Sequence, residues 1–185
     1  MSSRIILIGG GVRSGKSRFA LQLAQRIGTR RCFVATAQAF DDEMRIRIEA
    51  HASERAGAFE TVEVPHELAG ALRSIVHADV VLIDCLTLWL SNLLLRGDAV
   101  SAIEQQVEEL ARVLCERRFH SVLVSNEVGM GIVPETPLGR AFRDIAGRTH
   151  QQLAPVADEI YFAMLGTMLR LRPEPVHAET PRESR

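Results

Sequence analysis

A single lysine, Lys16, stands among the 22 lysine and arginine residues of the chain. It lies in the string Gly10-Gly11-Val12-Arg13-Ser14-Gly15-Lys16-Ser17, which fits the P-loop pattern G-x-x-x-x-G-K-[ST]. Backbone N–H groups of such a loop surround an anionic phosphate, and the flexible lysine ammonium follows the β- and γ-phosphates. The planar guanidinium of arginine has a different geometry and does not replace it. We therefore predict a nucleotide at residues 10–17, with the Ser17 hydroxyl as a ligand of Mg²⁺.

The segments on both sides of this loop have the order that a P-loop requires. The apolar run at residues 5–8 is typical of a buried parallel strand. After the loop, apolar side chains recur at roughly helical spacing until Gly28, which is a helix-ending residue. The order strand, glycine loop, helix favours a phosphate site over a chance glycine-rich turn.

An aspartate, Asp84, ends another buried apolar run, at residues 80–83. The carboxyl ends of parallel strands meet at one edge of a sheet, so Asp84 is expected near the P-loop. A carboxylate and a hydroxyl are ligands that Mg²⁺ accepts, which makes Asp84 and Ser17 a candidate metal pair. The alternative is that Asp84 caps the helix that follows it.

A third candidate site lies on a predicted helix at residues 41–55. Arg47, His51 and Arg55 are spaced by four, so they share one face of that helix. Two neighbouring guanidinium groups disfavour the imidazolium form and leave a free lone pair on the ring. Such a histidine suits nucleophilic attack on phosphorus, with the arginines binding phosphate oxygens. By itself the pattern favours a solvated helix face over a nucleophile.

The segment Ser125-Asn126-Glu127-Val128-Gly129-Met130-Gly131-Ile132-Val133-Pro134 follows a further predicted strand. Polar groups and glycines at a strand end suit a substrate loop and also suit an ordinary turn. Composition does not decide between these two interpretations.

Strand and helix patterns alternate along the chain, which predicts an α/β fold with a mostly parallel sheet flanked by helices. We expect one domain over residues 1–172 and a disordered tail over 173–185, where prolines and charges are frequent. The expected strands are 5–8, 31–35, 61–64, 80–84 and 121–125, the expected helices are 41–55, 67–76, 86–95, 100–117 and 138–153, and a closing hairpin is expected over 159–164 and 168–171.

Composition limits the possible partners and the compartment. The net charge of −1 leaves no broad basic surface, so nucleic acid is not an expected partner. No apolar run has membrane-spanning length, and residues 1–4 are followed directly by the first predicted strand, so we expect neither a membrane span nor a signal peptide. Cys32, Cys85 and Cys115 lack metal-type spacing and are expected to be buried or free thiols in a reducing cytoplasm.

Several strings together resemble the bifunctional adenosylcobinamide kinase / adenosylcobinamide-phosphate guanylyltransferase family of cobalamin biosynthesis. The resemblance runs from about residue 5 to residue 172. The strings that carry it are Gly10-Gly11-Val12-Arg13-Ser14-Gly15-Lys16-Ser17-Arg18, Ala35-Thr36-Ala37, Asp42-Glu43-Met44, Arg47-Ile48 with His51 and Arg55, Asp84-Cys85-Leu86-Thr87-Leu88-Trp89 with Asn92, the segment 125–134, and Phe142-Arg143-Asp144-Ile145-Ala146-Gly147-Arg148.

This resemblance implies a RecA-like P-loop NTPase fold, a homotrimer and two reactions. A nucleoside triphosphate, ATP or GTP with Mg²⁺, phosphorylates the aminopropanol hydroxyl of adenosylcobinamide. GTP then guanylylates a histidine, which matches His51 here, and the GMP passes to adenosylcobinamide phosphate to give adenosylcobinamide-GDP. Lys16 is the second implied catalytic residue. The implied nucleotide contacts are residues 10–17, Ala35, Thr36, Ala37, Arg47, Ala52, Ser53, Glu54, Arg55, Glu63 and Asp84.

Two positions depart from the pattern of this family. Ala50 stands where a second histidine is frequent, which leaves His51 as the candidate nucleophile. His150 stands where asparagine is usual, outside the nucleotide motifs.

Three other functions are compatible with a P-loop, and each leaves a feature of this sequence unexplained. A P-loop kinase of small metabolites without guanylyl transfer would have no use for His51. A GTP-dependent switch reads guanine with an Asn/Thr-Lys-x-Asp string, and Lys16 is the only lysine available. A RecA-like motor would need a basic groove for nucleic acid, which the charge does not favour.

Overall fold

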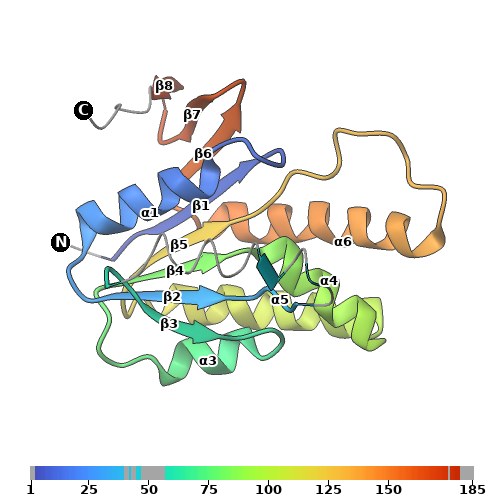
Figure 1. The fold of residues 1–185 in the computed structure, drawn as a ribbon, viewed down its shortest axis with the longest axis horizontal. Helices are drawn as coiled ribbons and strands as arrows, with labels where there is room; N and C mark the ends of the chain where they lie inside the picture. Colours follow the sequence, from blue (N-terminus) through green and yellow to red (C-terminus); the bar gives the residue numbers. More distant parts are fainter. Residues whose placement is uncertain (1–2, 40–41, 43–44, 47–56, 175, 180–185) are drawn as a thin grey trace.

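The structure is a computed structural model that describes residues 3–39, 42, 45–46, 57–174 and 176–179 (Figure 1). The predicted helix at 41–55 falls largely outside these ranges; Asp42, Arg45 and Ile46 are its described members, and all three are helical. Within the described part of the chain, no helix is long and apolar enough to cross a membrane.

A central sheet has the strand order β3-β2-β4-β5-β1-β6-β7-β8 across the described residues (Figure 1). The strands from β3 to β6 in this order run parallel, and β7 and β8 continue the sheet antiparallel. Their bounds are β1 Ile5–Gly10, β2 Arg31–Ala35, β3 Glu60–Glu63, β4 Val80–Asp84, β5 His120–Val124, β6 Glu159–Met164, β7 Thr167–Arg172 and β8 His177–Glu179.

Helices cover both faces of the parallel part of the sheet, because its strands are apolar on both faces. In β1, Ile5 and Leu7 pack with the α3–α6 side, whereas Ile6 and Ile8 pack with α1. The alternation is that of a pleated strand buried on each side. The helices are α1 Lys16–Ile27, α3 Leu68–Ser74, α4 Leu86–Arg96, α5 Val100–Cys115, α6 Pro137–Leu153 and the short 3₁₀ turn η1 Ala154–Val156.

The described elements confirm the α/β prediction, with strand and helix ends within a few residues of those expected. The closing hairpin is also confirmed, since β6 and β7 pair antiparallel around a turn at Leu165 and Gly166. Gly166 has φ +74, a conformation that glycine adopts at low cost. We expected no element after Pro173, yet β8 pairs with the free edge of β7. This strand forms through pairing with an edge and not through an apolar pattern of its own.

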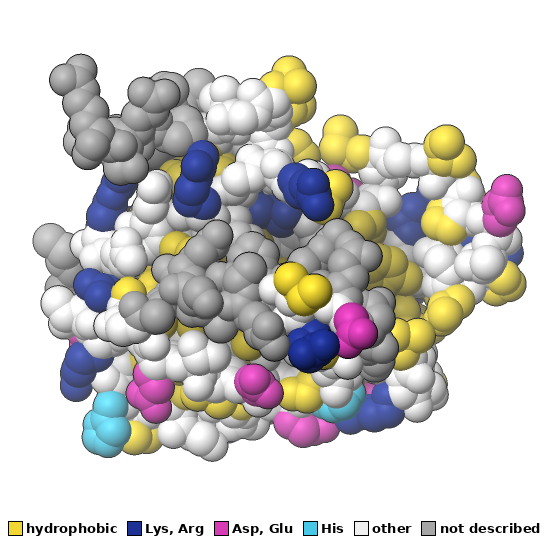
Figure 2. All heavy atoms as spheres, in the orientation of Figure 1, with side chains coloured by type: hydrophobic (Ala, Val, Ile, Leu, Met, Phe, Trp, Pro, Cys, Tyr) yellow, Lys and Arg dark blue, Asp and Glu magenta, His cyan; other side chains and the backbone are white. Residues whose placement is uncertain are grey.

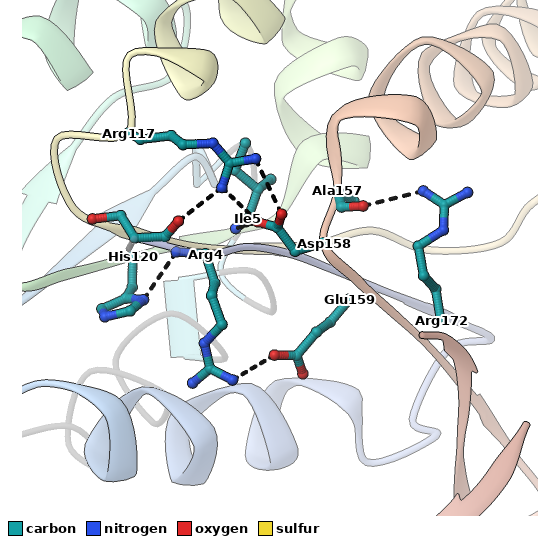
Figure 3. Close-up of polar contacts among 9 residues, drawn as sticks. Arg4, Ile5, Arg117, His120, Ala157, Asp158, Glu159 and Arg172 are labelled. Atoms are coloured by element: carbon teal, nitrogen blue, oxygen red, sulfur yellow. Dashed lines mark hydrogen bonds and ion pairs between the residues drawn. The ribbon is translucent and has the colours of Figure 1, made fainter. Parts of the chain in front are cut away.

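A set of ion pairs joins β1, β5 and β6 at the amino-terminal edge of the sheet, opposite the P-loop (Figure 3). Asp158 accepts from the backbone N–H of Ile5 at 2.7 Å and from Arg117 Nη1 at 2.8 Å. Arg4 donates to Glu159 at 2.5 Å. The hydrogen bonds from Arg117 and Ile5 lower the pKa of Asp158. These contacts fix the start of β1 against both neighbouring strands.

Candidate active site

The carboxyl ends of the parallel strands bring most of the predicted site residues to one edge. Ala35 at the end of β2 is level with Glu63 on one side and with Asp84 on the other. Asp84 is level with Val124, the last residue of β5, which adjoins β1. The P-loop follows β1 at this same edge. Residues from five separate segments of the sequence therefore meet here, as the strand pattern predicts.

The P-loop adopts the compact turn that its glycines allow. Gly10 has φ +145, and a Cβ there would lie 2.8 Å from the Cβ of Ala163 on β6. Gly15 has φ +89 and immediately precedes Lys16, the first residue of α1. A side chain at Gly10 would therefore separate β1 from β6, so glycine is required for both its conformation and its size.

Lys16 is buried, with 7% of its surface exposed, and its Nζ donates to the carbonyl oxygen of Gly11 at 2.9 Å. Burial lowers the pKa of Lys16, while the negative charge of Asp84 opposes that shift. The ammonium group thus lies within the electrostatic reach of Asp84. The arrangement joins the cation of the P-loop with the acid at the end of β4.

The remaining P-loop residues form the outer surface of the turn. Gly11, Val12 and Arg13 are exposed, and Arg13 has the unusual φ of 54. Ser14 Oγ is buried and has no hydrogen-bond partner among the described residues. A buried unpaired hydroxyl beside a phosphate loop is the kind of group that a bound ligand satisfies.

Ser17 and Asp84 fit a magnesium site by their chemistry. Ser17 is half-buried in the first turn of α1, next to Lys16, and Asp84 is near enough to act on the lysine charge. A hydroxyl oxygen and a carboxylate oxygen, completed by phosphate oxygens and water, match the ligands that Mg²⁺ prefers. Both residues are therefore suitable ligands for this ion.

Thr36 lies at the same edge and binds the backbone of Cys85. It is fully buried, and its Oγ1 accepts from the backbone N–H of Cys85 at 2.8 Å and donates to the Cys85 carbonyl at 2.7 Å. The Thr36 carbonyl accepts from Asn92 Nδ2 at 2.8 Å. The Thr36 backbone N–H donates to the Asp84 carbonyl at 3.4 Å, so Thr36 holds the ends of β2 and β4 together from inside the protein.

The other predicted contacts fall into two groups. Ala37 is half-buried just after Thr36, and Glu63 is exposed at the end of β3. The predicted nucleophile and the contacts around it lie outside the described residues: Arg47, His51, Ala52, Ser53, Glu54 and Arg55. The structure therefore brings together the P-loop, Ala35, Thr36, Ala37, Glu63 and Asp84.

A buried polar network behind Asp84 was not foreseen as a unit. Thr87 Oγ1 accepts from the backbone N–H of Asn126 at 3.2 Å and from Asn126 Nδ2 at 2.9 Å. The same oxygen lies 3.1 Å from Cys85 Sγ. Desolvation, followed by the charge of Asp84, raises the pKa of the Cys85 thiol to about 11. The network ties the end of β4 to the loop after β5.

His150 on α6 also reaches the loop after β5, which sequence reasoning missed. Its Nε2 lies 2.7 Å from Ser125 Oγ, and its Nδ1 lies 3.6 Å from a carboxylate oxygen of Glu127. The backbone N–H of Glu127 donates to the carbonyl of Gly10 at 2.9 Å. Burial lowers the pKa of His150, and Glu127 opposes this shift. His150 therefore holds a loop that is bonded to the start of the P-loop.

A signal for His150 was present in the helical spacing. It stands four residues after Ala146 and three before Leu153, two buried residues of α6. This spacing places the imidazole on the inner face of the helix, next to the carboxyl edge.

A comparison with protein families gives a match to the model of cobinamide kinase / cobinamide phosphate guanyltransferase over residues 6–171. The chain is 43% identical over 171 residues to the bifunctional adenosylcobalamin biosynthesis protein CobP of Pseudomonas aeruginosa. That alignment covers 92% of this chain and 98% of the relative. The chain is also 42% identical to the bifunctional adenosylcobalamin biosynthesis protein CobU of Escherichia coli, in an alignment that covers 91% of this chain and 99% of the relative.

Among solved structures, the crystal structure of the RadB recombinase is similar, with a TM-score of 0.51. The alignment covers 96% of this chain and 86% of the RadB chain, at 15% sequence identity. At this identity the similarity shows the fold alone, which is RecA-like. The family match and the two relatives agree with the P-loop edge described above. The chain therefore belongs to the family of bifunctional enzymes that phosphorylate cobinamide and transfer a guanylyl group to cobinamide phosphate.

Proposed function

We propose that the P-loop edge serves both activities of the family, with adenosylcobinamide as the corrinoid substrate. In the kinase reaction the aminopropanol oxygen attacks the γ-phosphorus of a nucleoside triphosphate. The bond from that phosphorus to the β–γ bridging oxygen breaks, the nucleoside diphosphate leaves, and the hydroxyl proton passes to solvent or a base. The products are adenosylcobinamide phosphate and, with ATP as donor, ADP.

In the second reaction we propose that a ring nitrogen of His51 attacks the α-phosphorus of GTP. The bond between the α-phosphorus and the α–β bridging oxygen breaks, and pyrophosphate leaves. A phosphate oxygen of adenosylcobinamide phosphate then attacks the same phosphorus and breaks the P–N bond. This step releases His51 and gives adenosylcobinamide-GDP. Arg47 and Arg55, at helical spacing on either side, are proposed to bind the phosphate oxygens.

The observation that carries this proposal is the buried Lys16 within the electrostatic reach of Asp84, at the end of a glycine loop. Negative charge that develops on phosphate oxygens in the transition state is stabilised most by cationic and hydrogen-bonding groups that are already in position in a partly desolvated site. When Mg²⁺ is bound it neutralises phosphate charge, and Ser17 and Asp84 would hold it. The backbone of the P-loop orients the phosphates.

We further propose a nucleotide-binding domain that spans residues 1–172, with contacts at Ala35, Thr36, Ala37, Ala52, Ser53, Glu54, Arg55 and Glu63 as the resemblance implies. The enzyme is proposed to work in the cytoplasm as a homotrimer. Free thiols at Cys32, Cys85 and Cys115 are compatible with a reducing compartment.

The assignment of His51 is tested by incubating the protein with GTP that is radioactive at the α-phosphate and measuring the label bound covalently to the protein. The wild-type chain should become labelled in an acid-labile, base-stable linkage, and mass spectrometry should place one GMP on the peptide that contains His51. His51→Ala should lose both the label and the formation of adenosylcobinamide-GDP. Phosphorylation of adenosylcobinamide should at least partly persist, because γ-phosphoryl transfer does not use the imidazole.

His77→Ala is the matched control, because His77 is an exposed histidine that precedes the start of β4, at the end of the parallel strands opposite the P-loop edge. It should label like the wild-type chain. GMP on His66, His120, His150 or another histidine, or transfer by His51→Ala, would show that the nucleophile is a different residue.

A further inference from the structure

A cavity of about 180 Å³ lies beside the P-loop on the side of the β6–β7 hairpin. Its walls are the P-loop residues 13–15, side chains of the first turns of α1, and residues 166–168 at the start of β7. The sheet order places it on the opposite side of β1 from β4 and β3, where Asp84 and Glu63 lie. We refer to it as the α1 pocket.

The chemistry of the α1 pocket suits a flat heteroaromatic ring with polar edges. Phe19 and Met168 give it apolar walls, and the Phe19 ring is held by Tyr161 with 5.0 Å between centroids. Arg18, Gln22 and Thr167 supply a guanidinium, an amide and a hydroxyl. Aromatic and cationic side chains bind purine rings by stacking, and amide and hydroxyl groups bond to their edges.

A second observation is the unpaired hydroxyl of Ser14. It belongs to the pocket wall, and it has no hydrogen-bond partner in the described part of the chain. Buried polar atoms without partners are rare, and a bound ligand is one of the usual reasons for them. The pocket is thus continuous with the phosphate loop and has an unused polar group at the junction.

The α1 pocket lies far along the sheet edge from Glu63, the implied nucleotide contact at the end of β3. From β1 to β3 there are four strand spacings, and at about 4.8 Å each the distance is roughly 19 Å. A nucleotide whose base lies near Glu63 therefore extends away from the α1 pocket. The two reactions also need different atoms in place, the α-phosphorus for guanylyl transfer and the γ-phosphorus for phosphorylation.

We propose that the α1 pocket binds the base and ribose of the nucleoside triphosphate that donates phosphate in the kinase step. The two nucleotides would then share the P-loop for their phosphates and point their nucleosides to opposite sides of β1. This inference rests on the two activities proposed above. A corrin ring is a poor occupant, because it is much larger than a purine and the cavity has a volume of only about 180 Å³.

Photolabelling tests the position without any turnover. The chain is irradiated with 8-azido-ATP and Mg²⁺, with and without excess ATP, and the labelled peptides are identified by mass spectrometry. ATP-protected label within residues 13–22 or 166–168 supports the proposal. Label confined to residues 35–37 or 63, or no ATP-protected label, overturns it. The result holds even if His51 is not the nucleophile.

Variants of Gln22 test the proposal through the two activities. Gln22→Ala removes the amide from the pocket wall and Gln22→Trp fills the space, and both should raise the KM for ATP in cobinamide phosphorylation about tenfold, which corresponds to about 1.4 kcal/mol. Labelling by α-labelled GTP should change less than twofold. Gln25→Ala, an exposed amide on the same helix and outside the cavity, is the control. Equal changes in both reactions, or none in either, would contradict separate positions for the two nucleosides.

Discussion

At the scale of single residues, Asp84 has two possible roles that a substitution separates. Its charge reaches Lys16 and Cys85, and it ends β4 directly before α4. If it is a magnesium ligand, Asp84→Asn should raise the Mg²⁺ concentration for half-maximal phosphorylation about tenfold or more, because a neutral amide is a weaker ligand than a carboxylate. The measurement is a magnesium titration of the initial rate.

Asp144→Asn on the exposed side of α6 is the control and should leave the titration unchanged. Loss of folded protein in Asp84→Asn, with an unchanged magnesium requirement in the fraction that folds, would favour the role of helix cap. Circular dichroism before the assay distinguishes the two outcomes.

His150 should make the stability of the protein depend on pH in a defined direction. Burial holds its pKa below the ordinary value near 6.5. As the pH falls below that value, the unfolded chain takes up a proton that the folded chain binds less readily, so stability is lost toward acid. His150→Asn should reduce the fall in the urea midpoint between about pH 7.5 and pH 5.5.

The control for this pH series is His77→Asn, at an exposed histidine. It should follow the wild-type curve. A His150→Asn variant with the full wild-type pH dependence would mean that the imidazole contributes nothing to it, and that other groups such as His120, whose pKa is also lowered by burial, account for the slope.

At the scale of elements, Asn92 connects α4 to the ends of β2 and β3. It is 3% exposed, and its Nδ2 donates to the carbonyls of Thr36 at 2.8 Å and Pro65 at 3.0 Å. Asn92→Ala leaves both carbonyls without this donor, so the free energy of unfolding should fall by about 1–3 kcal/mol. Urea denaturation measures the change.

Gln105→Ala, an exposed amide on α5, should change the free energy of unfolding by less than about 0.5 kcal/mol. If Asn92→Ala were as stable as this control, the two hydrogen bonds would be replaceable by water, and the carboxyl edge would be less rigid than the contacts indicate.

The same elements show what the sequence could and could not predict. Continuous apolar runs such as 5–8 and 80–83 predict buried parallel strands, and both were confirmed as β1 and β4 because such runs need cover on two faces. The P-loop and Asp84 lie at one edge, as predicted, because both follow or end parallel strands at their carboxyl ends. The partners of His150 and Thr87 were not predictable, since they depend on which helix packs over which strand end. The strand β8 depends on the free edge of β7 and has no pattern of its own.

At the scale of the whole molecule, the loop between β5 and α6 extends outward from the carboxyl edge (Figure 1). Hydrophobic side chains are visible on this projection in Figure 2. Met130 is 79% exposed, Ile132 is 97% exposed and Val133 is 56% exposed. Exposed apolar groups gathered in one segment are typical of surfaces that contact another protein. We expect this loop to lie at a subunit boundary of the proposed homotrimer.

Light scattering coupled to gel filtration should give the mass of a trimer for the wild-type chain and a smaller mass for Ile132→Lys/Val133→Lys. Val76→Lys, at an exposed apolar position before β4, is the control and should stay trimeric. A monomeric wild-type protein would contradict the trimer. A trimeric double variant would place the boundary on another surface.

The position of β1 in the sheet affects when the protein can fold during its synthesis on the ribosome. Ile6 pairs with Val122 on one side and with Glu159 on the other. Both neighbouring strands are therefore translated long after β1, the second about 150 residues later. At roughly 5–20 residues per second, β1 waits roughly 8–30 seconds for its last partner. The P-loop, which follows β1 directly, should therefore become able to bind nucleotide only after β6, at Glu159–Met164, has also been synthesised.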